Sequence, residues 1–160
     1  MDEFSLNSKA FCRVVSSMRD NGNISCIKVK AYGNSMAPFI KTGETIFIKP
    51  FSRKNRIRTG DIVAITDKNQ AKIIVHRIIG KKKGTVELKG DNCTKKDGWF
   101  PKNRIIGIAV RKKKISGKTI TFTGWKNIII ALASKTGILN HFILPFGRAL
   151  KNSLQAADKK

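Results

Sequence analysis

Acidic residues are scarce in this chain, which carries 10 Asp and Glu against 33 Lys and Arg and therefore has a formal charge of +23. A positive field of this strength attracts polyanions, and it is compatible with either nucleic acid or an acidic membrane face as a partner. Net charge does not select a fold, so it leaves the class of function open.

Cysteine is rare as well, and long apolar runs are missing. Cys12, Cys26 and Cys93 form no CxxC pair, so we expect a reducing compartment, no disulfide framework, no metal and no cofactor. The N-terminus has no apolar core of the kind found in secretory signals, and no stretch reaches the roughly 20 apolar residues of a membrane-spanning helix. The nearest candidate, Asn127 to Gly147, is interrupted by Lys135. The expected location is the cytoplasm, with peripheral membrane contact as the alternative.

The length and the apolar content predict one folded domain. A chain of 160 residues has the size of a single domain, and 41% apolar residues are enough to form a core. Short β-branched runs separated by Gly, Asp, Asn and Lys fill the middle of the chain, and no βαβ alternation occurs. They predict a mainly β fold: an antiparallel, barrel-like domain with a short N-terminal helix and a C-terminal helical tail. The expected boundaries are 1–26 for the helical segment, 27–123 for the β domain and 124–160 for the tail.

The tail is both basic and apolar. Its pattern predicts helix from Ile128 to Ala133 and from Phe142 to Leu154, with a bend at Gly137. Such a helix either lies in a membrane interface or covers the open face of the barrel.

Four segments carry residues suited to hydrolysis: GNSMAPF around Ser35, GDIVAI from Gly60, VHRIIG around His76, and KGDNCTKKDGWF with Asp91 and Asp97. A serine hydroxyl attacks an amide only if a base takes its proton, a further group orients that base, and donors stabilise the oxyanion. His76 suits the base because imidazole is neutral and basic near physiological pH, and either acid can hold its other nitrogen. Taken singly, Ser35 is more simply a turn residue and His76 more simply a sheet residue, and Asp91 suits a β-turn, so no single position establishes catalysis.

A lysine base is the other possibility for a chain so rich in lysine. It would have to be neutral, which requires burial to lower its pKa. Lys72 is the lysine closest in sequence to the VHR segment, and the lysines around it look solvated. The position of His76 therefore favours the histidine.

The ordered blocks SM-x-P, GD-x-V, V-H-R, K-G-D-N with a second Asp six positions on, and I-x-G resemble signal peptidase I of the endoplasmic-reticulum and archaeal type. This family of membrane-associated serine proteases shares a mostly β fold with LexA-like repressors, and the similarity runs from about Tyr32 to Val110. It implies a serine endopeptidase with Ser35 as nucleophile and His76 as general base. It implies Asp97 as the group that orients His76 and Asp91 as a supporting carboxylate.

The alternative function is a non-catalytic basic β module that binds nucleic acid or an anionic membrane surface. Nucleic acid is disfavoured, although the charge is compatible with it, because the aromatic residues of the β region do not alternate with basic ones as a stacking platform requires. The expected partners are therefore a peptide or protein substrate and an anionic membrane surface contacted by the C-terminal tail.

Overall fold

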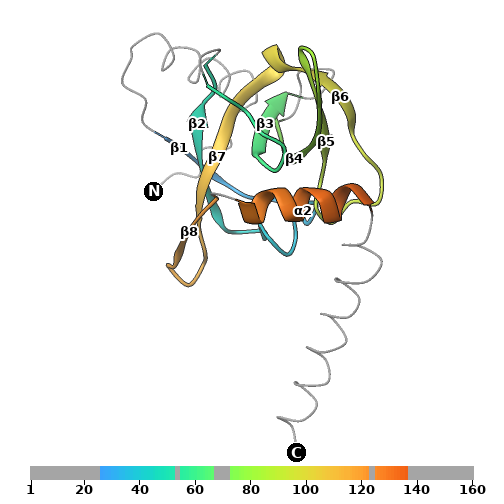
Figure 1. Ribbon diagram of the computed structural model, residues 1–160. Coiled ribbons are helices and arrows are strands. Elements are labelled where there is room, and N and C mark those ends of the chain that lie inside the picture. Colours follow the sequence, from blue (N-terminus) through green and yellow to red (C-terminus); the bar gives the residue numbers. More distant parts are fainter. Residues whose placement is uncertain (1–25, 53–54, 67–72, 123–124, 137–160) are drawn as a thin grey trace, which may run out of the picture.

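The computed structural model describes residues 26–52, 55–66, 73–122 and 125–136. The predicted N-terminal helix and the second half of the predicted tail lie outside these ranges. The described chain forms one eight-stranded antiparallel sheet and one long helix (Figure 1). Its elements are β1 (Ile27–Lys30), β2 (Thr45–Pro50), β3 (Ile62–Thr66), β4 (Ile73–Lys82), β5 (Thr85–Lys89), β6 (Gly98–Pro101), the 3₁₀ turn η1 (Lys102–Arg104), β7 (Ile105–Lys113), β8 (Thr119–Thr121) and α2 (Trp125–Thr136).

The strand order is β1-β2-β7-β3-β4-β5-β6, with β8 paired to β7 beside this path. The mainly β, antiparallel fold expected from the sequence is confirmed. The sheet curls around its core without closing, because among the described residues β1 and β6 remain its two ends.

The core lies on both faces of the central strands. In β3, Ile62 and Ala64 point into one apolar cluster, whereas Val63 and Ile65 point into another. Successive side chains of a strand face opposite sides, so an uninterrupted apolar run belongs to a strand buried on both faces. This explains why the segment IVAIT shows no alternation of polar and apolar residues.

One strand was not expected. The segment GWFP forms β6, which pairs with β5 through the register Val86 with Phe100 and Glu87 with Trp99. It is short and ends in Pro101, and proline is tolerated at the edge of a sheet because an edge strand has one row of unpaired backbone groups.

The helix α2 packs against the sheet with one side. The first turn of the helix packs directly on Gly60. A Cβ at Gly60 would lie 2.6 Å from the Asn127 carbonyl oxygen, so only glycine leaves room for this contact. The Lys89 ammonium group donates a hydrogen bond to the Ser134 carbonyl in the last turn. The helix predicted around Ile128–Ala133 is therefore present. It lies over the sheet, with Gly60 at its first turn and Lys89 at its last turn.

Candidate active site

Ser35 lies in a turn that two buried neighbours hold in place. The chain leaves β1 and turns at Gly33, whose φ of +82° favours glycine. Met36 and Ile40 then enter the core, with exposed fractions of 5% and 3%. The Ser35 side chain remains half-buried. The core thus anchors the turn on one side while the hydroxyl stays accessible.

His76 lies in the middle of β4, where it is opposite Val63 of β3. The pairing of β4 with β5 begins only at the next residue, Arg77, which is opposite Lys89. Beyond Lys89 the chain leaves the sheet in the loop of residues 90–97. His76 therefore lies at the point where β5 departs, and space beside the imidazole is open to groups from that loop.

Three side chains from these separate elements form a hydrogen-bonded row. The His76 Nε2 atom lies 2.9 Å from Ser35 Oγ, and His76 Nδ1 lies 2.6 Å from Asp97 Oδ2. A carboxylate only accepts hydrogen bonds, so Nδ1 carries the proton in the neutral ring and Nε2 is free to accept from the Ser35 hydroxyl. This is the arrangement that activates a serine nucleophile.

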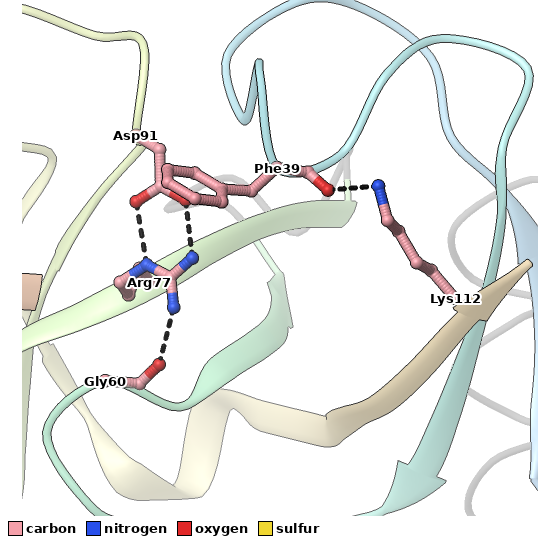
Figure 2. Close-up of polar contacts among 5 residues, drawn as sticks. All are labelled: Phe39, Gly60, Arg77, Asp91 and Lys112. Atoms are coloured by element: carbon pink, nitrogen blue, oxygen red, sulfur yellow. Dashed lines mark hydrogen bonds and ion pairs between the residues drawn. The ribbon is translucent and has the colours of Figure 1, made fainter. Parts of the chain in front are cut away.

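Asp91 occupies a different place from Asp97. It is fully buried and accepts two hydrogen bonds of 2.7 Å, from Nε and Nη2 of Arg77. Arg77 also donates to the Gly60 carbonyl oxygen at 2.8 Å. Figure 2 shows the guanidinium group between these partners, and its carbon lies 5.5 Å from the centre of the Phe39 ring. A buried bidentate pair of this kind holds backbone segments in a fixed relation.

The loop of residues 90–97 is also tied directly to the Ser35 turn. Asn92 donates its backbone N–H to the Ser35 carbonyl oxygen at 2.8 Å and its side-chain amide to the Asn34 carbonyl oxygen at 3.1 Å. Gly90 packs so closely that an added Cβ would lie 2.7 Å from the Ser35 carbonyl oxygen and 3.0 Å from His76 Nε2. Sequence reasoning did not single out Gly90 and Asn92, although both stand within the KGDN block.

Two other nucleophilic or basic groups lie near this row. Burial raises the pKa of the Cys93 thiol, so this side chain is a protonated thiol at neutral pH and a weak nucleophile. Burial lowers the pKa of Lys89, which is only 2% exposed. Nothing in the sequence indicated that Lys89 is buried; the residue is buried because β5 carries it under α2. Its ammonium group contacts α2, and Lys72 lies outside the described residues.

The described residues contain no group of three or more His, Cys, Asp or Glu side chains placed to hold a metal ion. Within the same part of the chain, no helix has the length and apolar character needed to cross a bilayer.

Comparison with known proteins gives one family match. The model of the Peptidase S24-like family matches residues 2–110, which is more than half of the chain. No curated protein matches the chain significantly. The matched region includes the Ser35 turn, β4 with His76, and the loop that carries Asp97. On this evidence, the chain belongs to the Peptidase S24-like family, whose members are serine peptidases and proteins with a LexA-like fold.

Proposed function

We propose that this protein is a serine endopeptidase of the signal-peptidase type that cleaves a peptide or protein substrate. The observation that carries the proposal is the row Asp97–His76–Ser35, with heavy-atom distances of 2.6 and 2.9 Å. Its members come from a loop, a strand and a turn that are far apart in the sequence. Such convergence of nucleophile, base and orienting group is the geometry that acyl transfer requires.

In the proposed reaction, His76 Nε2 takes the hydroxyl proton as Ser35 Oγ attacks the carbonyl carbon of the scissile bond. The backbone N–H of Ser35 is our candidate donor to the oxyanion. His76 then protonates the leaving amine, and the acyl-enzyme that remains is hydrolysed by a water molecule deprotonated by the same imidazole. Asp97 keeps the ring oriented and stabilises its charged form.

The pairing of the strands supports an extended peptide as substrate. In β4, Ile73–Val75 pairs with β3 on one side, and its pairing with β5 begins only at Arg77. Among the strands that the structure describes, β1, which leads to the Ser35 turn, is an end strand of the sheet. Both therefore offer backbone groups next to Ser35 to which an extended peptide can add as a further strand.

The test is cleavage of a combinatorial peptide library followed by mass spectrometry. We expect Ser35→Ala and His76→Ala each to lower the cleavage rate at least about 10³-fold, because each removes a member of a unit that acts together. Ser116→Ala, which changes an exposed serine in the β7–β8 turn, is the matched control and should cleave like the wild type. Equal cleavage by the wild type and Ser35→Ala would refute the proposal.

A further inference from the structure

A long stretch in the second half of the chain lacks acidic residues. No Asp or Glu occurs between Gly98 and Ala157, whereas this stretch contains many lysines and arginines. The acidic residues of the described region all lie earlier and all accept hydrogen bonds: Glu44 from Lys112, Asp61 from the Arg58 backbone, Glu87 from Lys96, Asp91 from Arg77, and Asp97 from His76. Among the described residues, the positive charge of β7, of the β7–β8 turn and of α2 is therefore mostly uncompensated.

The same part of the chain exposes large aliphatic side chains. In α2, Ile128, Ile129 and Leu132 are 43%, 53% and 55% exposed, although Ala131 and Ser134 on the opposite side are fully buried. Residues three and four positions apart share one side of a helix, so the three aliphatic residues form a single outward stripe. Exposing them to water is unfavourable unless another surface covers them.

The turn between β7 and β8 has the same character. Its sequence KKISGK contains Ile115, which is 80% exposed, between Lys114 and Lys118. Exposed lysines flank an exposed isoleucine here, just as Lys135 follows the stripe on α2.

These two elements border a common groove. Lys114, Ile120 and Phe122 line it from the β7–β8 hairpin, and Asn127 and Ile130 line it from α2. Figure 1 shows the β7–β8 turn and α2 at the lower side of the molecule. We call this surface the basic apolar face; it consists of Lys113, Lys114, Ile115 and Lys118 of the hairpin and Ile128, Ile129, Leu132 and Lys135 of α2.

We propose that the basic apolar face docks on an anionic lipid bilayer. Lysines are attracted to the negative headgroups, and aliphatic side chains between them enter the boundary of headgroups and acyl chains. Nucleic acid fits the same charge less well, because single strands are held by stacking on aromatic side chains and the apolar residues here are aliphatic. The basic apolar face contains neither Ser35 nor His76, so the docking proposal does not depend on peptidase activity.

The test uses the full-length protein and vesicles of phosphatidylcholine with or without phosphatidylserine, with binding measured by co-sedimentation. We expect preference for the anionic vesicles. Each lysine near an anionic surface contributes about fivefold to the partition coefficient, so the triple change Lys113→Gln, Lys114→Gln and Lys118→Gln should lower it about 100-fold. Replacing Ile128, Ile129 and Leu132 by Gln, a good helix former, should also lower it at least about 10-fold.

The matched control removes the same charge at the other end of the sheet, through Lys82→Gln, Lys83→Gln and Lys102→Gln. Lys102 donates its backbone N–H to Gly84 in the β4–β5 turn, which lies at the top of Figure 1. These positions are screened from a bilayer at the opposite end, so we expect less than about a fivefold change.

Three results would overturn the docking proposal: no preference for anionic vesicles, equal losses in the control and the face variants, or salt-sensitive binding to single-stranded DNA without vesicle binding. Ser35→Ala should bind vesicles like the wild type. Failure of the docking proposal is thus distinguishable from failure of the peptidase proposal.

Discussion

At the scale of single residues, the two acids of the KGDNCTKKD segment have different tasks. Asp97 accepts a hydrogen bond from the imidazole of His76, whereas Asp91 neutralises the buried guanidinium group of Arg77. The resemblance to signal peptidases implied this division, but chemistry alone accepted either acid as the partner of His76. The distances assign Asp97 to the ring and Asp91 to the scaffold behind it.

Separate phenotypes should follow for the two acids. Asp97→Asn should lower kcat about 10²–10⁴-fold with little loss of stability, because an amide favours the wrong tautomer of the imidazole. Asp91→Asn should lower the free energy of unfolding by about 3 kcal/mol, because Arg77, only 1% exposed, loses its charged partner. Peptide-cleavage kinetics and urea unfolding of both variants measure the two effects. Identical phenotypes would contradict the assignment.

Gly90 provides a second test at this scale. Its φ lies outside the left-handed region, so alanine meets no backbone strain there, only the groups around it. We expect Gly90→Ala to lower kcat/KM at least about 100-fold, because its Cβ displaces His76 Nε2 and the Ser35 backbone. Gly80→Ala is the control: its Cβ meets Glu87 and Trp99 at 3.0–3.4 Å instead, and activity should persist. Peptide-cleavage rates decide between the two outcomes.

At the scale of elements, α2 is joined to the sheet at both ends. The first turn of α2 packs on Gly60, and the Lys89 ammonium group donates a hydrogen bond to a carbonyl oxygen of the last turn. A positive charge at this end of a helix also interacts favourably with the helix dipole. The sequence left open whether the tail covers the sheet or faces a membrane. One side of α2 does cover the sheet, while the other side is exposed and available for the docking that we propose.

We therefore expect Gly60→Ala to loosen α2. The added Cβ would lie within 3 Å of backbone atoms of Asn127 and Ile128, so the helix must shift, and we expect a loss of about 2–4 kcal/mol in unfolding free energy. Faster amide exchange confined to α2 should accompany it. Gly84→Ala is the control, since Gly84 also has positive φ but no neighbour within 4 Å. Similar exchange in both variants would show that α2 does not rest on Gly60.

At the scale of the whole molecule, stability should also depend on a second buried ion pair, which joins the loop after Ser35 to β7. Lys112 Nζ lies 2.7 Å from Glu44 Oε2, and both side chains are nearly inaccessible to water. Lys112 also donates to the Phe39 carbonyl oxygen (Figure 2). Burial by itself raises the pKa of Glu44, but hydrogen bonds from Lys112 and from the Lys41 backbone outweigh it, so the pKa is lowered from 4.5.

The sign of the pH effect follows from this lowered pKa. The folded state favours the Glu44 carboxylate, so its stabilisation is complete above the ordinary pKa of 4.5 and disappears as the pH falls through the folded-state pKa. Glu44→Gln should cost about 2 kcal/mol near pH 7 and progressively less below pH 4.5. Urea unfolding as a function of pH measures this.

The control is Glu87→Gln, whose partner Lys96 is 44% exposed and therefore screened by water. Its cost should stay below about 1 kcal/mol at every pH. A loss for Glu44→Gln that does not shrink on acidification would contradict the role assigned to the ion pair.

The sequence alone predicted the mainly β antiparallel fold, because strand formation follows from local β-branched runs such as IVAIT and IIVHRIIG. It missed β6, since GWFP is too short to show a period and is held by its pairing with β5. The order of the sequence blocks, through their resemblance to signal peptidase I, also identified Ser35, His76, Asp91 and Asp97 as candidate site residues. Their catalytic roles remain a proposal, to be decided by the variants above.

Only the tertiary structure decided which acid faces His76, that Arg77 and Asp91 form a buried pair, that Lys89 is buried beneath α2, and which side of α2 is exposed. These properties depend on strand register and on where a loop returns to the sheet, so they join residues far apart in the chain. Local pattern determines whether a segment is a strand or a helix because it reflects neighbours two positions away in a strand and three or four positions away in a helix. Contacts between distant segments leave no such periodic trace in the sequence.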